Sequence, residues 1–207
     1  MIYVRIPKHI GIIPDGNRRW ALSKSMTKDK GYNNGLQPGL SAFRHCKELG
    51  VNEISIYGYT TDNNKRPKEQ RLAFTKACID MINIIKKEDA EILVVGNTKS
   101  EMFPKELIDL TTRKKFNNGG TKVNFLINYS WEWDLKNKNV TYYNTDNISR
   151  IDLIIRWGGM RRLSGFLPVQ SVYADFYVVD RLWPEYCNED INDALSWYQM
   201  QDITLGG

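Results

Sequence analysis

Residues 9–21 read His9-Ile-Gly-Ile-Ile-Pro-Asp-Gly-Asn-Arg-Arg-Trp-Ala21, and this stretch contains the signals that decide the fold. The apolar run His9–Ile13 is short enough for one buried strand, and Pro14-Asp15-Gly16-Asn17 is a strong turn signal. Arg18–Lys24 contains neither Gly nor Pro, so a helix can begin directly after the turn. The stretch therefore predicts a strand–loop–helix unit, which is the building block of a parallel α/β sheet.

The same alternation continues along the chain. Strands are expected at His9–Ile13, Glu53–Tyr59, Ile92–Val95, Val123–Ile127, Asp152–Ile155 and Phe176–Val179. Helices are expected at Arg18–Lys24, Leu40–Leu49 and Glu69–Lys87, near Lys105–Lys115, and at Glu189–Met200. We find no internal repeat and no linker, and Lys136–Ser149 is typical of a surface loop. The sequence therefore predicts one α/β domain over residues 1–207, with a central, mostly parallel six-stranded sheet flanked by helices.

The composition is that of a globular chain. Hydrophobic residues make up 42% of the 207 residues and charged residues 26%, which argues against disorder. No apolar run approaches the length of about 18 residues that a membrane-spanning helix needs, and Met1–Pro14 lacks the pattern of a signal peptide. Three cysteines without a CxxC pair and only two histidines nearly exclude a zinc site. We therefore expect a cytoplasmic protein with reduced cysteines.

The net charge of +5 is distributed unevenly. Residues 1–75 carry thirteen Lys and Arg against six Asp and Glu, whereas residues 176–207 carry six acidic residues and one arginine. A basic first half fits an anionic partner of three kinds: a nucleic acid, a phosphorylated small molecule or an acidic membrane surface. It also fits a surface that is charged only for solubility. The placement of the basic residues in the fold has to distinguish these alternatives.

Three polar segments follow predicted strands directly. They are Asp15–Arg19, Thr60–Arg66 and Arg156–Ser164. In open α/β sheets, ligands bind outside the carboxyl ends of the strands. We therefore expect the three segments to converge on one site.

The first segment combines a carboxylate with two arginines at the start of a helix. Backbone N–H groups at a helix N-terminus attract anions. Asp15 would repel a phosphate directly but suits Mg²⁺, which takes carboxylate oxygens and shares phosphate oxygens with them. The alternative is a turn in which Asp15 only caps the helix.

The third segment places Arg156, Arg161, Arg162 and Ser164 around a Gly-Gly pair. Arginine forks match phosphate oxygens, and glycines let the backbone approach closely. The common nucleotide-binding glycine motifs are absent, as is a Ser–His–Asp set, and His9 and His45 are interpreted as structural.

Taken together, the three segments resemble the cis-prenyltransferases, the undecaprenyl diphosphate synthase family. His9–Ala21 is similar to that family's first motif and Ser55–Pro67 to its second. Asp152–Pro168 is similar to the third, followed by Gln170–Tyr177 and Leu182–Tyr186. The resemblance runs from His9 to the final glycines in the same order, so it is highly specific.

The resemblance implies a homodimer that joins isopentenyl diphosphate to an allylic prenyl diphosphate with Mg²⁺, without nucleic acid, and with peripheral membrane contact for releasing a lipid product. It implies that Asp15 holds the metal and that Asp175 stands where the family has a second ligand. Asn63 matches the family's proposed proton acceptor and Arg66 its pyrophosphate-binding arginine. By the same likeness, the diphosphates would be held by Gly16, Asn17, Arg18, Arg19, Trp20, Lys28, Tyr32, Thr60, Thr61, Asp62, Asn64, Arg156, Arg162, Leu163 and Ser164. An apolar tunnel is expected from Phe74, Cys78, Met81 and Ile85, whose helical spacing equally fits plain core.

Several positions depart from the family pattern. Tyr32 stands where many members have His, Asn64 where they have Trp, Arg161 where they have His, and Thr204 where an arginine reaches the partner subunit. Trp157 replaces a small residue, and we expect its indole to crowd the second substrate. The segment between Asn128 and Arg156 is also short. These departures predict a short- or medium-chain product rather than a long linear one.

Three other functions are alternatives to this one. The same site could join prenyl units head-to-middle and give a branched product, which Trp157 and Arg161 motivate. A non-catalytic accessory subunit would generally lack the aspartate of the first motif, which is present here as Asp15. A nucleic-acid binder is disfavoured because no recognisable binding motif occurs.

Overall fold

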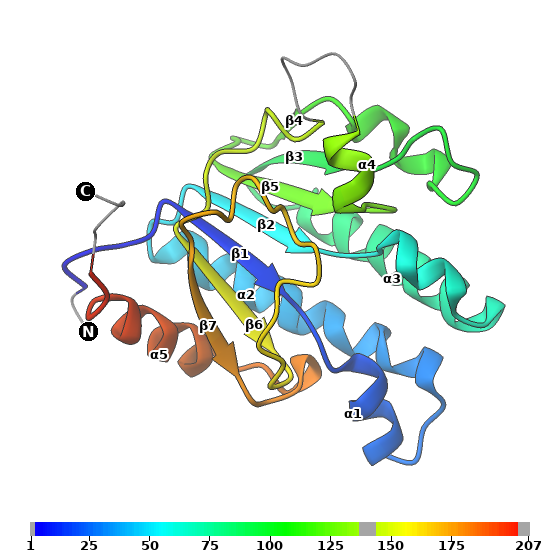
Figure 1. Ribbon diagram of the computed structural model, residues 1–207, viewed down its shortest axis with the longest axis horizontal. Coiled ribbons are helices and arrows are strands. Elements are labelled where there is room, and N and C mark those ends of the chain that lie inside the picture. The colour runs from blue at the N-terminus through cyan, green and yellow to red at the C-terminus, as the bar shows by residue number, and fades with distance from the viewer. Residues whose placement is uncertain (1–2, 137–143, 203–207) are drawn as a thin grey trace.

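The computed structural model describes residues 3–136 and 144–202, which form one α/β domain (Figure 1). Its sheet has seven strands in the order β4-β3-β5-β2-β1-β6-β7. The strands are β1 (His9–Ile13), β2 (Glu53–Tyr57), β3 (Ala90–Val95), β4 (Lys114–Phe116), β5 (Thr121–Leu126), β6 (Leu153–Trp157) and β7 (Asp175–Val179). All strands are parallel except β4, which pairs antiparallel with β3 at one edge.

The helices cover the two faces unequally. The α-helices are α1 (Asn17–Ser23), α2 (Leu36–Glu48), α3 (Lys68–Ile85), α4 (Trp131–Leu135) and α5 (Asn188–Tyr198). Short 3-10 helices are η1 (Lys28–Gly31), η2 (Asn33–Gly35), η3 (Thr61–Lys65), η4 (Lys105–Leu110) and η5 (Trp183–Glu185). α2 packs against both α3 and α5 on one face of the sheet, and α4 lies over the other face (Figure 1).

The six predicted strands are present, with ends that differ by at most two residues. The prediction of six strands was nevertheless wrong, because β4 is a seventh. The helix expected near Lys105–Lys115 is the 3-10 helix η4, which ends at Leu110, and the chain then enters β4. Only Leu107 and Leu110 of η4 are buried, so no apolar stripe was available to hold a longer helix.

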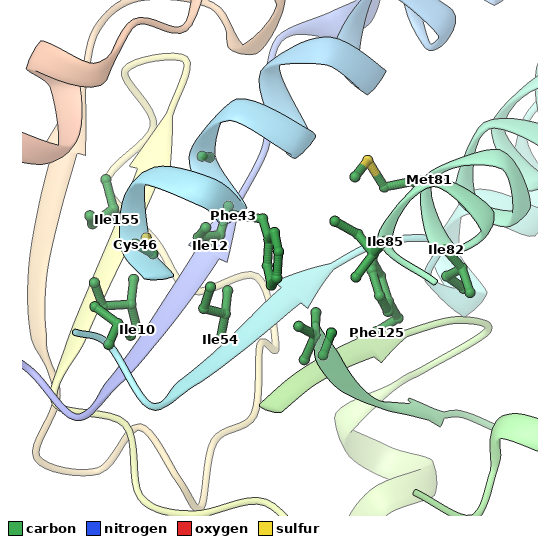
Figure 2. Packing of buried hydrophobic residues seen from close by; sticks show 14 of the residues in the cluster. Ile10, Ile12, Phe43, Cys46, Ile54, Met81, Ile82, Ile85, Phe125 and Ile155 are labelled. Atoms are coloured by element: carbon green, nitrogen blue, oxygen red, sulfur yellow. The ribbon is translucent and has the colours of Figure 1, made fainter. Parts of the chain in front are cut away.

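The larger core lies between the sheet and the layer of α2 and α3 (Figure 2). Ile10, Ile12 and Ile54 of the sheet face Phe43 of α2 and Ile82 of α3, and all five are at most 1% exposed. β1 and β6 are buried along their whole length, as expected for central parallel strands covered on both faces. This rigid centre fixes where the segments that follow β1 and β6 begin.

A buried polar cluster at the amino-terminal half of the sheet explains His9. Its Nε2 lies 2.9 Å from Ser55 Oγ, and burial lowers the pKa of His9. Glu53 accepts hydrogen bonds from Ser149 (2.6 Å) and Asn124 (2.7 Å). Burial opposes the charge on Glu53, but the neighbouring His9 and these hydrogen bonds outweigh it and lower the pKa of Glu53. The cluster binds strands together, which fits the structural interpretation of His9.

This cluster makes stability depend on pH in a defined direction. Because folding lowers the pKa of Glu53, its contribution is complete above the unfolded carboxyl pKa of about 4.3 and is lost as pH falls through the lowered value. We expect Glu53→Gln to reduce the free energy of unfolding by about 1–3 kcal/mol at pH 7 and by less at pH 3. Urea titrations of both proteins at the two pH values measure this. A difference that is the same at both would contradict it.

Candidate active site

A cationic hollow of about 390 Å³ opens at the carboxyl edge of the sheet, and we call it the cradle. Its lining consists of Pro14, Asp15, Gly16, Asn17, Arg18, Arg19, Leu22, Lys28, Tyr32, Arg66, Phe74, Met160 and Arg162. Five of these residues are cationic and only Asp15 is anionic. Such a lining suits a ligand with several negative charges.

Asp15 directly follows β1 and lies between two arginines. Its carboxylate is 2.9 Å from Arg156 Nη2 and 3.5 Å from Arg19 Nη2. The interpretation of Asp15 as a helix cap is wrong, because the N-cap of α1 is Gly16 and no side chain caps this helix. Gly16 has a φ of 112°, which favours glycine, and Leu182 packs too closely for a side chain there.

Arg156 connects the first and third segments. It leaves the end of β6 with only 4% of its surface exposed. Its Nη1 donates to the Arg162 carbonyl and to Ser164 Oγ (3.0 Å), while Nη2 donates to Asp15 (2.9 Å). Its Nε is buried without a partner among the described residues. One guanidinium therefore positions both the Asp15 carboxylate and the Ser164 loop.

A second hollow of about 240 Å³ adjoins the cradle. Among its lining residues are Thr60, Asp62, Asn63, Arg66, Arg156 and Ser164, together with Tyr57 and Gly58. Asn63 is buried and accepts a hydrogen bond from the Thr60 backbone N–H (3.1 Å). The second and third segments therefore meet at this hollow, and Asp15, Arg66 and Phe74 line both hollows.

An aromatic group forms part of the boundary between the cradle and the interior. Tyr32 stacks on Phe74 with ring centroids 4.5 Å apart and planes 8° from parallel. Arg66 donates to the Tyr32 hydroxyl (2.9 Å) and lies over the Phe74 ring at 5.3 Å. Burial raises the pKa of Tyr32, so its side chain stays a phenol at neutral pH. Burial lowers the pKa of Arg66, but a guanidinium stays protonated in proteins. The guanidinium of Arg66 is thus held in place before any ligand arrives.

An apolar cavity of about 70 Å³ continues inward from the cradle. Pro14, Asn17, Tyr32 and Phe74 line both spaces. The cavity is bounded further by Leu36, Gly39, Ile56, Ala77, Cys78, Met81, Phe125, Ile127 and Trp183, among others. Of the expected tunnel residues, Phe74, Cys78 and Met81 line it, whereas Ile85 is fully buried in the core and does not.

Four expected binding residues line neither the cradle nor the second hollow. They are Trp20, Thr61, Asn64 and Leu163. Asn64 accepts a hydrogen bond from the Tyr59 hydroxyl (2.5 Å), and Leu163 packs against the smaller core cluster. Asn64 and Leu163 thus make contacts within the protein that stabilise the loops in which they lie.

Asp175 is the first residue of β7 and is in register with Leu153, which is in register with Ile10. It therefore lies at the amino-terminal edge of the sheet, whereas Asp15 follows the carboxyl end of β1. Five-residue parallel strands therefore separate Asp175 from Asp15 within one chain, and Asp175 as a metal ligand stays a prediction. No group of three or more His, Cys, Asp or Glu side chains suited to a metal occurs among the described residues.

Trp157 is fully buried and does not line the cradle or the second hollow. Its indole lies on the core side of β6, against Trp183 and Tyr186. Side chains alternate across a strand, so Trp157 points away from the face to which Arg156 points. The expected crowding of the second substrate by Trp157 is therefore wrong.

Sequence reasoning missed Leu22, Tyr57 and Met160. The Tyr57 hydroxyl donates to the Ser164 carbonyl (2.8 Å), and Met160 lines the cradle. Tyr57 lies within the second motif, Met160 within the third and Leu22 directly after the first, and these positions were the available signal. Residues 203–207, including Thr204, and residues 137–143 of the predicted loop lie outside the described part of the chain.

Comparisons with known proteins show what the whole chain is similar to. The prenyltransferase family model described as undecaprenyl diphosphate synthase matches residues 13–206. An isoprenyl transferase of Leptospira interrogans is 32% identical, with 98% of this chain and 95% of that protein covered. A ditrans,polycis-undecaprenyl-diphosphate synthase of Micrococcus luteus, specific for (2E,6E)-farnesyl diphosphate, is also 32% identical, with 98% and 92% covered.

The solved structures include a neighbour with the same fold. Lavandulyl diphosphate synthase from Lavandula x intermedia, in complex with dimethylallyl diphosphate, superposes with a TM-score of 0.82 at 22% identity. The match covers 97% of this chain and 98% of that one. The protein therefore belongs to the cis-prenyltransferase family. It is an enzyme that transfers prenyl groups to form prenyl diphosphates.

Proposed function

We propose that this enzyme condenses isopentenyl diphosphate with an allylic prenyl diphosphate, with Mg²⁺, to give a prenyl diphosphate of short or medium length. The observation that carries the proposal is that the cationic cradle adjoins an apolar cavity, with Tyr32 and Phe74 in both linings. An allylic diphosphate has this same division into a charged head and an apolar chain.

The single carboxylate of Asp15 suits a magnesium ion that is also bound by substrate phosphates. Mg²⁺ is commonly held by one or two carboxylates together with substrate phosphates. Asp15 is a single, partly exposed carboxylate at the wall of a cradle built for phosphates. Asp15 would therefore hold the ion jointly with the allylic diphosphate, and the ion would neutralise charge on the departing diphosphate.

The protein residues have separate tasks in this reaction. Arg18, Arg19 and Arg66 hold the allylic diphosphate where negative charge grows as its bond to carbon breaks, which lowers the barrier. The apolar walls keep water from the cationic allylic carbon. The isopentenyl double bond attacks that carbon, forms the new C–C bond and loses a proton.

Arg156 and Ser164 are positioned to hold the second diphosphate, because both line the second hollow beside the cradle. In our proposal, Asn63 orders the Thr60–Arg66 loop. Its amide oxygen already accepts from Thr60, and a neutral amide is a weak base. The diphosphate oxygens of the substrates are then the basic atoms available for the proton.

The direct test is a product analysis. The protein is incubated with Mg²⁺, labelled isopentenyl diphosphate and dimethylallyl, geranyl or farnesyl diphosphate, and the dephosphorylated alcohols are identified by mass and NMR. Linear alcohols one or a few isoprene units longer than the primer support the proposal. A branched alcohol would indicate the head-to-middle alternative, which has lost the support expected from Trp157.

The small cavity is the reason for proposing a short product. A cavity of about 150 Å³ holds a benzene ring, and this one measures about 70 Å³. Met81 of α3 is part of its wall, with its sulfur packed against Gly39 of α2. We expect Met81→Ala to deepen the cavity and to lengthen the main product by one or more isoprene units in the same product analysis.

Ile85→Ala is the matched control for that change. Ile85 lies one turn further along α3, is fully buried, and lies outside the cavity lining. Both substitutions should cost about 2–5 kcal/mol of stability, but only Met81→Ala should change product length. Equal product profiles for the two variants would contradict the role of Met81.

We further propose a homodimer inside the cell that touches an acidic membrane surface when it releases product. No described helix is long and apolar enough to cross a membrane. Leu22 and Met26 are exposed by 55% and 39% and are close in sequence to Lys24 and Lys28, and of these four residues Leu22 and Lys28 line the cradle. Light scattering tests the dimer, and co-sedimentation with phosphatidylglycerol vesicles against phosphatidylcholine vesicles tests the contact.

A further inference from the structure

Three aromatic rings stand behind one wall of the apolar cavity, and we call them the tryptophan wedge: Trp157, Trp183 and Tyr186. The Trp157 and Trp183 centroids are 4.8 Å apart and their planes meet at 79°, an edge-to-face contact. Tyr186 lies 5.8 Å from Trp157 and 5.6 Å from Trp183. Such edge-to-face and tilted contacts are favourable arrangements of aromatic rings in a close-packed interior.

Trp183 is the member of the wedge that reaches the cavity. It lines the cavity wall and is only 4% exposed. Its Nε1 donates to the Gly35 carbonyl (3.1 Å), and a Cβ at Gly35 would lie 2.9 Å from the indole. Trp183 is therefore confined on the side of η2, and the rings of Trp157 and Tyr186 also pack against it.

Trp157 is fixed more firmly than an ordinary core residue. It is fully buried, and its Nε1 donates to the Asp190 carboxylate (3.0 Å) near the start of α5. Asp190 also accepts from the Cys187 backbone N–H (3.2 Å) and pairs with Arg181 at 3.6 Å. This anchoring defines where the Trp157 ring lies and, through the edge-to-face contact, where Trp183 lies.

We infer that Trp157 is a positioning residue for substrate length: it holds Trp183 against the cavity and thereby limits the prenyl chain that the enzyme accepts. The inference rests on the proposed prenyl transfer and concerns the apolar end of that site. Trp157 touches no substrate, since it lines neither hollow nor the cavity. It acts through the neighbouring ring, because removing its bulk gives Trp183 space to withdraw.

The test compares two primers in the same protein. For each variant, kcat/KM is measured for dimethylallyl and for farnesyl diphosphate with isopentenyl diphosphate, and their ratio is taken. We expect Trp157→Thr to shift the ratio about tenfold or more toward farnesyl diphosphate. Trp157→Phe keeps a ring behind Trp183 and should stay within about threefold of the original ratio.

A purely structural role would lower stability without changing the ratio. Ile155→Ala, which removes a fully buried side chain two residues earlier on the same face of β6, is the control for lost stability. An unchanged ratio in Trp157→Thr, or the same shift in Ile155→Ala, overturns the inference. If Trp157→Thr does not fold, Trp157→Leu carries the same comparison.

A binding experiment separates this inference from the proposed reaction. Calorimetric titration with the unreactive thiolodiphosphate analogues of the two primers measures the binding affinity for each. The ratio of these affinities tests chain-length preference without turnover. If the unchanged protein transfers no prenyl group from any primer, the proposed function fails. If it does transfer one, but Trp157→Thr changes neither the kcat/KM ratio nor the affinity ratio, only the inference about Trp157 fails.

Discussion

Asp15→Asn is expected to lower kcat by about 10²–10³, which corresponds to about 3–4 kcal/mol of transition-state stabilisation. The change keeps the size of the side chain but removes the one carboxylate of the cradle. Without that charge, Mg²⁺ and the allylic diphosphate would share no protein oxygen of high affinity. The concentration of Mg²⁺ needed for half-maximal rate should rise together with the loss of kcat.

Asp109→Asn is the control for Asp15→Asn. Asp109 is 85% exposed and pairs with Lys114 at 3.7 Å, far from the cradle in the fold. It should leave kcat and the Mg²⁺ requirement within about twofold. Activity of Asp15→Asn within fivefold of the unchanged enzyme at saturating Mg²⁺ would remove Asp15 from the metal site.

Arg156→Lys should reduce kcat/KM by about 10²–10³ although the positive charge is kept. A lysine presents one compact ammonium group and cannot reach Asp15, the Arg162 carbonyl and Ser164 Oγ with separate donors, as the guanidinium does. We expect KM for isopentenyl diphosphate to rise more than KM for the allylic substrate, because Arg156 and Ser164 line the second hollow.

Two further substitutions check the assignment of Arg156. Arg44→Lys makes the same change at an exposed arginine that pairs with Glu88 on another face, and should leave both KM values unaltered. Arg162→Ala should also raise KM for isopentenyl diphosphate more than KM for the allylic substrate. Its side chain lines the cradle, but its carbonyl accepts from Arg156, and the likeness to the family assigns it to the second diphosphate. Equal weakening of both substrates by Arg156→Lys would mean that the two diphosphate positions are assigned wrongly.

Much of the fold could be predicted because local signals agreed with the tertiary structure. The run His9–Ile13 followed by Pro14-Asp15-Gly16-Asn17 indicated a strand that ends in a turn, as the structure has it. The apolar run before Arg156 indicated a buried strand and so placed that arginine at the strand's carboxyl end. The topology then brings the three polar segments together, since β2, β1 and β6 are neighbours in the sheet. β4 could not be predicted, because three residues at an edge carry no periodicity.

The positions of Trp157 and Asp175 follow from strand geometry that could have been read from the sequence. Trp157 follows Arg156 on the same strand, so alternation already places the two side chains on opposite faces. Asp175 begins a strand, and parallel strands place their beginnings at the edge away from Asp15. The depth of the cavity could not be read from the sequence. It depends on how Met81 packs against Gly39, two residues that are 42 positions apart.

The ion pair of Asp15 with Arg156 joins residues 141 positions apart. During synthesis, the ribosome must therefore release about three-quarters of the chain before this contact can form, and β6 must dock beside a strand made much earlier. Contacts of such long separation form slowly, because a large loop has to close first. We expect refolding followed by tryptophan fluorescence or circular dichroism to finish in two stages, with catalytic competence returning in the slower one.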